Sequence, residues 1–272
     1  MSKDVIPSVA QVSAEYAKCQ DKEALEQVQT YGTFIGYPYS GHSLVGSLLD
    51  AHPNMIFAHE LHALSYIRAG FTQQLLFYSL LENSRAFTAE GRTWNGYQYS
   101  VPNQWHGRYR ELRVIGDKKG GGTSREFGTN PEMLQALSNA VPIRKKFIHV
   151  IRNPFDNIST ISKRMFPVRN SAAGFYFSLA TSVASMMSRV PKEDIFHLKH
   201  EDFVARPKQL LTELCRFLGE EVSSDYLDDC ASIVREAPNK SRLTVEWTAE
   251  QKQKVQRHID NFSFLAGYNF DG

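Results

Sequence analysis

Residues 31–52, YGTFIGYPYSGHSLVGSLLDAH, contain the pattern that decides the fold. They open with a short apolar run at 33–35 (TFI), which predicts a buried β-strand. A turn follows at 36–41, because glycine, proline and serine break regular structure there. Apolar residues then repeat at helical spacing: Leu44, Val45, Leu48 and Leu49. In a strand–loop–helix of this kind, backbone N–H groups and the positive end of the helix dipole meet at one point, which suits an anion such as phosphate.

The loop is close to the nucleotide-binding pattern G-x-x-x-x-G-K-(S/T). Gly36, Gly41 and Ser43 are in register, and His42 stands where the lysine belongs. Because that lysine normally reaches the β- and γ-phosphates, its absence weakens the prediction of a nucleotide triphosphatase. The alternative is an ordinary tight turn between strand and helix, in which glycine serves only the backbone conformation. We favour the anion-binding loop.

Composition narrows the class of protein. The chain has 272 residues, 42% of them hydrophobic, which is enough for the full core of one α/β domain. A net charge of +2 without long charged runs argues against nucleic-acid binding. Cys19, Cys215 and Cys230 have neither metal-ligand spacing nor an even number, so reduced structural cysteines are expected. No apolar run could span a bilayer, and the N-terminus lacks the apolar core of a secretory signal, so we expect a cytoplasmic protein.

Strands and helices alternate along the rest of the chain. Further strands are expected at 55–57, 113–119, 147–151 and 195–199, and helices at 64–86, 130–140, 171–190, 207–219 and 248–265. This alternation predicts one P-loop-like α/β domain over residues 31–272, with a central, mainly parallel sheet flanked by helices. Residues 1–30 are expected to be a helical lead-in, with a helix at about 8–28. The glycines at 120–122 allow either a close backbone approach or movement.

Two segments outside the loop are candidates for a substrate site. Glu60 directly follows the strand at 55–57. Ligands of open α/β sheets lie beyond the carboxyl ends of strands, so Glu60 is expected near the anion loop. Residues 91–109 combine glycines with aromatic side chains, which are Trp94, Tyr97, Tyr99, Trp105 and His106. Such a segment predicts either the lining of a substrate pocket or a surface loop held by aromatic anchors.

Four segments, in order, carry a family resemblance. The first is PYSGHS at 38–43, the second VIRNPFDNIST at 150–160, the third HLKHEDFVARPKQLLTELCRFLG at 197–219, and the last LAGY at 265–268. They resemble the P-x-S-G-(T/S)-(T/S) loop, the R-N-P-x-D strand end, the E-D-L…P…FLG segment and the terminal L-x-G-Y of sulfotransferases that use 3′-phosphoadenosine 5′-phosphosulfate (PAPS). The layout is most similar to tyrosyl-protein-type and bacterial sulfotransferases, and it implies a sulfotransferase domain at 31–272.

The loop departs from the family pattern at two positions. Tyr39 stands where the family usually has lysine or arginine, and His42 stands where threonine is common. The loop has therefore lost a positive charge and gained an imidazole whose protonation depends on its surroundings. Lys118, in the sequence GDK, resembles a lysine that tyrosyl-protein-type sulfotransferases carry at a comparable strand end. It is the candidate for the missing cation.

The resemblance implies an in-line transfer of a sulfuryl group from PAPS to a hydroxyl or amine acceptor. The product of PAPS would be 3′,5′-adenosine bisphosphate (PAP), and no metal would be required. The backbone N–H groups of Ser40, Gly41, His42 and Ser43, the Ser43 hydroxyl and Lys118 would hold the phosphosulfate and stabilise its charge. Arg152 with Thr160 would hold the 3′-phosphate, and Ser159 is the neighbour of Thr160. Further candidates for the nucleotide are Arg164, Lys240, Ser241 and Arg242. For the last three, a solvated basic turn is equally compatible with the sequence.

Removal of the acceptor proton needs a base within hydrogen-bond reach. By its distance from the DAHP segment, Glu60 resembles the catalytic glutamate of tyrosyl-protein sulfotransferases. The alternative is a carboxylate that only stabilises a helix N-terminus. His42, His59 and His62 are rival bases. The acceptor itself, a sugar, phenol, lipid headgroup or peptide tyrosine, is not specified.

Two other functions stay open at this stage. A P-loop kinase or nucleotide hydrolase would use ATP and Mg²⁺, with residues 36–43 as Walker A and Asp117 as the Walker B aspartate. His42, and an arginine rather than an acid after the clearest strand, count against it. A non-catalytic PAPS-binding protein is the other alternative, kept open by Tyr39. It would gain support if Lys118 failed to reach the loop.

Overall fold

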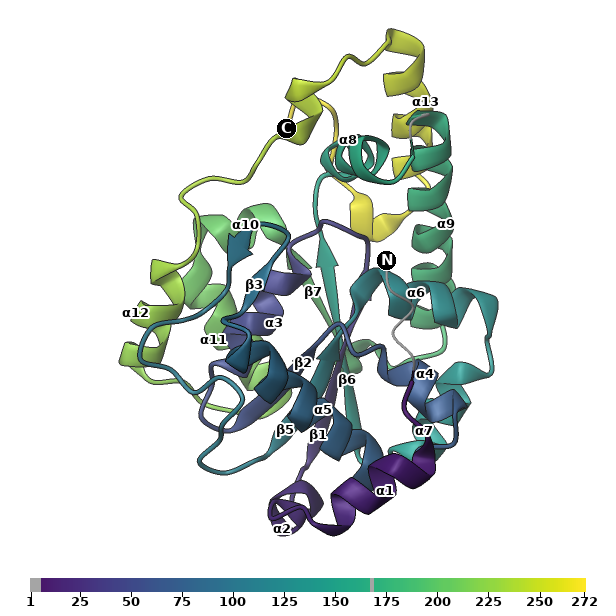
Figure 1. Ribbon diagram of the computed structural model, residues 1–272. Helices are drawn as coiled ribbons and strands as arrows, with labels where there is room; N and C mark the ends of the chain where they lie inside the picture. Colours follow the sequence, from purple (N-terminus) through teal and green to yellow (C-terminus); the bar gives the residue numbers. More distant parts are fainter. Residues whose placement is uncertain (1–5, 167–168) are drawn as a thin grey trace.

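The computed structural model describes residues 6–166 and 169–272, and its centre is a five-stranded sheet (Figure 1). The strand order is β2-β5-β1-β6-β7, and neighbouring strands of this sheet pair in parallel. The strands are β1 Thr30–Gly36, β2 Met55–His59, β5 Val114–Lys118, β6 Arg144–Ile151 and β7 Ile195–Lys199. Helices flank the sheet, so the predicted α/β class is confirmed. A separate hairpin pairs β3 Thr93–Trp94 with β4 Tyr97–Gln98.

Strand β1 is the middle strand of the sheet, and every one of its residues is buried. It pairs with β5 on one side and with β6 on the other. Gly32 and Gly116 face each other across the first of these pairs, and a Cβ on either would lie within 2.7 Å of the Phe57 ring. The two glycines therefore make room for an aromatic side chain at the sheet surface. The loop after β1 emerges at the carboxyl edge of the central strand.

The helices account for most of the remaining chain. They are α1 Val9–Ala17, α2 Lys22–Glu26, α3 His42–Asp50, α4 Ala63–Arg68, α5 Gln73–Ala89, α6 Gly120–Thr129, α7 Met133–Ala140, α8 Pro154–Arg164, α9 Arg169–Met187, α10 His200–Ala205, α11 Pro207–Leu218, α12 Ser224–Ser232 and α13 Ala249–Ile259. Short 3₁₀ turns are η1 Lys192–Asp194, η2 Ser241–Thr244 and η3 Ser263–Leu265. Within the described residues, no helix has both the length and the apolar composition to cross a membrane.

Several expected helices differ from the observed ones. The helix expected at 64–86 is two helices, α4 and α5, since Gly70 between them has φ +88°. The helix expected at 8–28 is likewise divided into α1 and α2, and the one expected at 248–265 ends at Ile259, before the turn η3. The glycines at 120–122 begin a helix rather than a loop.

Neighbouring residues of strand β1 belong to two different hydrophobic clusters of the core. Ile35 packs with Leu76 and Leu80 of α5, whereas Phe34 packs with Leu48 and Leu49 of α3. Leu25 and Val28 of the lead-in join the cluster of Ile35. Residues 1–5 of that lead-in lie outside the described residues, and the boundary at residue 31 stays a prediction.

A third cluster joins α8, α9 and α13 beyond the carboxyl edge of the sheet. After α12, the chain runs past α8, which η2 contacts, and reaches α13 beside α9 (Figure 1). Residues from the last quarter of the chain thus return to the edge where β1 ends.

Candidate active site

The loop between β1 and α3 is held by hydrogen bonds from a side chain of helix α8. Tyr39 has φ 65°, and Gly41, the residue before the first turn of α3, has φ +98°. The side-chain amide of Asn157, on α8, donates to Pro38 O at 2.6 Å and to Ser40 Oγ at 2.9 Å. No side chain caps the N-terminus of α3. Its first N–H groups are therefore oriented for an anion without a competing protein acceptor.

His42 turns its ring inward. Nε2 lies 3.2 Å from Ile35 O, and the ring packs edge-on against Phe34. Burial lowers the pKa of His42 to about 4. The imidazole is therefore neutral near pH 7, and it does not supply the cation missing from the loop. What His42 presents to the loop is its backbone N–H, in the first turn of α3.

Lys118 joins the loop to Glu60. Its Nζ lies 3.0 Å from Ser43 Oγ and 2.5 Å from Glu60 Oε1. The lysine is 2% exposed. Its stem runs against α3 at Gly46, where a Cβ would lie 2.6 Å from Lys118 Cγ. Glycine at position 46 thus leaves the path along which Lys118 reaches the loop.

Glu60 is held by two cations. Lys119 Nζ lies 2.6 Å from Glu60 Oε2, while Lys118 binds the other oxygen. Burial raises the pKa of Glu60, but the two ammonium groups outweigh that effect and lower the pKa to about 2. Burial lowers the pKa of Lys118, opposed by Glu60. The cluster therefore carries an ionised carboxylate beside a buried ammonium.

Asp117 points to the other side of β5, because neighbouring side chains of a strand alternate. Its carboxylate accepts the N–H groups of Leu61 at 3.2 Å and of Ala63 at 2.8 Å, at the start of α4. Burial raises its pKa to about 6. Asp117, rather than Glu60, is thus the carboxylate at a helix N-terminus, and it does not face Ser43 as a Walker B aspartate would. Among the described residues, no three His, Cys, Asp or Glu side chains form a cluster that could hold a metal ion.

Helix α6 packs directly on the loop, and its glycines make this possible. A Cβ on Gly120 would lie 2.4 Å from His42 Nε2, and one on Gly121 would lie 3.0 Å from Pro38 Cδ. Of the two alternatives for these glycines, the structure shows the close approach. The residue before α6, Lys119, makes no side-chain cap.

Arg152, at the end of β6, bridges two segments. It donates through Nη1 to Tyr39 O at 2.9 Å, and through Nη2 to Asn239 O and, at 3.3 Å, to Ser241 Oγ. The residue is 7% exposed, and its Nε has no hydrogen-bond partner among the described residues. Arg164 is exposed, with its guanidinium 5.5 Å from the centre of the Tyr39 ring. Two arginines therefore contact Tyr39, and one of them also binds Ser241.

Three other candidates, Ser159, Thr160 and Arg242, form hydrogen bonds or an ion pair within the protein. Thr160 donates its hydroxyl to Asp156 O at 2.9 Å. Ser159 is buried and accepts from Trp247 Nε1 at 3.1 Å. Arg242 is also buried, and its Nη1 lies 2.6 Å from Asp156 Oδ2. Arg242 is thus neither a solvated basic residue nor a free one, whereas Lys240 is exposed.

The rival histidine bases, His59 and His62, have different surroundings. The ring of His59 stacks on Phe87 at 3.9 Å and meets the edge of Trp94, on the β3–β4 hairpin, at 5.0 Å. Burial lowers the pKa of His59 to about 3. His62 Nδ1 lies 2.8 Å from Ser65 Oγ, and burial lowers its pKa too.

The aromatic segment 91–109 divides into an anchored part and an exposed part. Arg92 is buried in an ion pair with Asp50 at 2.7 Å, and His106 accepts from Val101 N at 2.7 Å. Trp94 and Tyr97, opposite each other in the hairpin, are 41% and 38% exposed. The exposed pair lies on the side of the segment that meets His59.

Three residues near the loop were missed from the sequence: Lys119, Asn157 and His200. His200 begins α10, directly after β7, so the strand-end rule could have found it. Its Nδ1 is buried without a hydrogen-bond partner among the described residues, and a Cβ on Gly41 would lie 2.6 Å from it. Burial, together with the charge of Arg152, lowers the pKa of His200 to about 4.

Comparisons with known proteins agree on one family. A sequence profile described as "Sulfotransferase family" matches residues 34–224, well over half of the chain. The sulfotransferase domain of the Synechococcus PCC 7002 olefin synthase is a similar solved structure, with a TM-score of 0.57 at 15% identity over 86% of this chain and 94% of that one. A sulfotransferase from Alicyclobacillus acidocaldarius gives a TM-score of 0.50 at 15% identity, over 88% and 96%. Sulfotransferase STF9 from Mycobacterium avium gives 0.50 at 14%, over 93% and 81%. No curated protein sequence matches.

Proposed function

Because the chain belongs to the sulfotransferase family, we propose that this enzyme transfers a sulfuryl group from PAPS to a hydroxyl or amine acceptor. The observation that carries the proposal is the position of Lys118. Its buried ammonium lies 3.0 Å from Ser43 of the anion loop and 2.5 Å from the carboxylate of Glu60. A cation shared by these two groups replaces the charge that Tyr39 does not supply, and it lies between the donor loop and the proposed base.

The residues at the loop fit the phosphosulfate end of PAPS. The N-terminus of α3 has no capping side chain, and the N–H groups of residues 40–43 belong to its first turn and the loop before it. Such N–H groups, with the Ser43 hydroxyl and Lys118, stabilise charge where a sulfuryl group leaves a phosphate. PAPS supplies the activated sulfuryl group, and this chain's residues hold and orient it.

Unpaired buried nitrogens support a second anion site for the 3′-phosphate. Arg152 Nε and His200 Nδ1 have no hydrogen-bond partner among the described residues. Buried polar groups are normally paired, so these two atoms suggest a missing partner, and for Arg152 Nε, which can only donate, that partner is an acceptor. We assign Arg152 and Ser241 to the 3′-phosphate, with Arg164 and Lys240 at its solvent side. Ser159, Thr160 and Arg242 hold α8 and η2 in place around it.

Glu60 is the proposed general base. Its carboxylate is ionised near pH 7, since two ammonium groups lower its pKa to about 2. Anionic oxygens at Ser43 would attract Lys118 and free Glu60 Oε1 for the acceptor proton, while Lys119 keeps Oε2 in place. The exposed Trp94 beside His59 suits a hydroxyl-bearing acceptor such as a sugar, phenol, lipid headgroup or peptide tyrosine. The unpaired cysteines support the predicted cytoplasmic location.

The two alternative functions lose their support in the geometry. Asp117 binds the start of α4 instead of facing Ser43, so a metal-dependent kinase would lack its Walker B group. Lys118 reaches the loop, so the observation that would have strengthened the non-catalytic alternative is not made.

Calorimetric titration with PAP, and separately with ATP and Mg²⁺, tests the proposal. We expect micromolar PAP binding without metal, and no ATP binding. Replacing Arg152 by alanine should weaken PAP binding at least about tenfold, because a buried charge-assisted contact is lost. The matched change Lys240→Ala, at an exposed site, should have a smaller effect. Binding of ATP–Mg²⁺ with no response to PAP would overturn the proposal, and unchanged affinity in Arg152→Ala would refute the 3′-phosphate assignment.

A further inference from the structure

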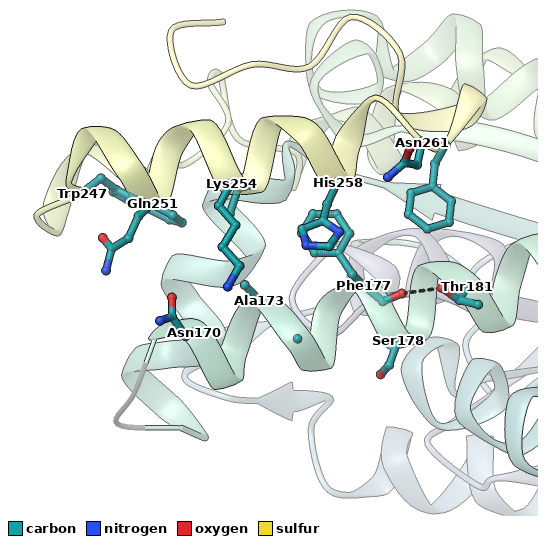
Figure 2. A pocket seen from close by; sticks show the side chains of 13 residues that line it. Asn170, Ala173, Phe177, Ser178, Thr181, Trp247, Gln251, Lys254, His258 and Asn261 are labelled. Carbon is teal, nitrogen blue, oxygen red and sulfur yellow. Dashed lines mark hydrogen bonds between the residues drawn. The ribbon is translucent and has the colours of Figure 1, made fainter.

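A groove runs between α9 and α13, lined by residues that the proposed catalytic site does not use (Figure 2). Its volume is about 500 Å³, within the range of small-molecule sites in proteins. The helices lie side by side in the third core cluster, and that cluster supplies the floor through Phe177 and Val255. The groove is therefore a defined hollow over packed side chains.

Aromatic side chains line the floor and the sides of the groove. Trp247 lies at one end of the groove and Phe177 lies further along it (Figure 2). Phe262, which also lines the groove, is stacked with Phe177, with ring centroids 6.3 Å apart. The ring of His258 stacks on Phe177, with centroids 4.7 Å apart and planes 27° apart. Flat aromatic walls select flat aromatic ligands through offset or edge contacts. The lining thus favours a planar ring system over a flexible chain.

One cation lies over this aromatic groove. Lys254 extends from α13 across the groove towards α9 (Figure 2). Its ammonium has no ion-pair or hydrogen-bond partner in the described part of the chain, and no described residue of the lining is acidic. Amide groups of Asn170, Gln251 and Asn261 complete the polar rim. The charge of the groove is therefore complementary to an anion.

We propose that this groove binds a small planar aromatic molecule carrying an anionic group, with the ring against Phe177 and the anion at Lys254. Trp247 links the groove to the proposed cofactor site. Its Nε1 donates to Ser159 Oγ at 3.1 Å, and its ring packs against Phe155 at 5.1 Å. Both partners lie on α8, which begins two residues after Arg152. A ligand in contact with Trp247 thus touches the helix that supports the 3′-phosphate site.

Binding of 2-naphthoate, measured by calorimetry with the active site saturated with PAP and again without PAP, tests the proposal. We expect binding in both conditions, and weaker binding of the neutral 2-naphthamide. Lys254→Gln should weaken 2-naphthoate binding about fivefold, the scale of an exposed ion pair, and leave 2-naphthamide within about twofold. Arg257→Gln, an exposed change on the same helix outside the lining, is the matched control and should change neither.

Gly174 offers a second variant that closes the groove without disturbing the fold. It lines the groove on α9, and a Cβ there meets no atom within 4 Å. Leucine is a better helix former than glycine, so Gly174→Leu should fill the space, keep the fold and abolish 2-naphthoate binding. Ser185→Leu, about three turns further along α9, should bind normally. The proposal would be overturned if the wild type did not bind 2-naphthoate, or if the Gly174→Leu and Lys254→Gln variants bound it as tightly as the wild type does. The titration of 2-naphthoate without PAP depends neither on cofactor binding nor on turnover. A negative result there would therefore count against the groove and not against the sulfotransferase assignment.

Discussion

At the scale of single residues, the site depends on a buried charge that has two partners. Removing an ammonium group from water is costly unless it is paired and hydrogen-bonded. Lys118 meets this condition through Glu60 and Ser43, and Gly46 leaves space for its stem. The same contacts place the cation beside the anion loop. Lys118 therefore contributes both to the stability of this cluster and to the proposed affinity for an anion.

Replacing Glu60 by glutamine should lower turnover at least about 100-fold, because a general base contributes that much or more. PAP affinity should stay within about twofold, since the amide oxygen still accepts from Lys118. Steady-state kinetics and PAP calorimetry measure the two effects, with the exposed Glu111→Gln as control. Strong residual activity would move the base to one of the histidines.

Replacing Lys119 by methionine should change the pH dependence of the reaction. Two ammonium groups lower the pKa of Glu60 from its ordinary 4.5 to about 2. Since removing a cation raises the pKa of a carboxylate, the acid limb of kcat/KM should move about one pH unit upwards. The stabilisation of the fold by ionised Glu60 is present above pH 4.5 and is lost as the pH falls towards 2. This stabilisation of the fold by ionised Glu60 should be smaller in Lys119→Met. An acid limb at the wild-type pH would show that Lys119 does not act on the base.

At the scale of elements, sequence patterns located the strands better than the helices. The expected buried runs at 33–35, 55–57, 113–119, 147–151 and 195–199 all correspond to strands, because near-continuous apolar runs fit a sheet covered on both faces. Helix α6 was missed, since GGGTSREFGT lacks an apolar period and begins with three glycines. Its packing against His42 and Pro38 overrides that low propensity.

The residues of the candidate site were also predicted only in part. The strand-end rule brought Glu60 near the loop, and the motif resemblance pointed to Arg152 and Lys118. Lys119, Asn157 and His200 were missed because each acts on a partner far away in the sequence. Local patterns do not specify such partners. The inward turn of the His42 ring was hidden for the same reason, since its position depends on α6.

Replacing Gly120 by alanine tests this packing. The new methyl group would lie 2.4 Å from His42 Nε2, so the ring or the helix must shift. We expect a loss of about 1–3 kcal/mol in the free energy of unfolding, as in other overpacked sites. PAP binding should weaken as well, because the loop moves with His42. Urea unfolding and PAP calorimetry measure both effects.

Gly174→Ala is the matched control for that change. Gly174 lies within helix α9, and a methyl group there would meet no atom within 4 Å. Alanine should therefore stabilise the helix by up to about 1 kcal/mol. PAP affinity should not change. If Gly120→Ala, like this control, lost neither stability nor PAP affinity, glycine at position 120 would not be required for the close packing of α6 on the loop.

At the scale of the whole molecule, the proposed cofactor site is closed by a segment from the end of the chain. Arg152 binds Asn239 and Ser241, while the buried pair of Arg242 and Asp156 fastens this segment to α8. Arg242 Nε also donates to Phe270 O at 2.7 Å. One buried ion pair thus holds together α8, the 239–242 segment and the C-terminus. The proposed cofactor site therefore depends on residues 239–242 and on their attachment to Phe270.

Replacing Arg242 by glutamine should destabilise the fold by about 3–5 kcal/mol, because it leaves the carboxylate of Asp156 buried without its charge partner. PAP affinity should also fall, although Arg242 is not assigned to the cofactor, since residues 239–241 lose their attachment. Lys163→Gln, which removes an exposed contact to Thr244 at 2.7 Å, should change stability by less than about 1 kcal/mol.

The double variant Asp156→Asn with Arg242→Gln separates the two effects of that change. It contains no unpaired buried charge, so it should recover much of the stability that Arg242→Gln loses. PAP affinity should recover only as far as the amide pair restores the position of residues 239–241. If affinity stayed at the wild-type level in the single variant while stability fell, the segment would be a structural strap without a part in cofactor binding. In that case Arg152 alone would carry the 3′-phosphate.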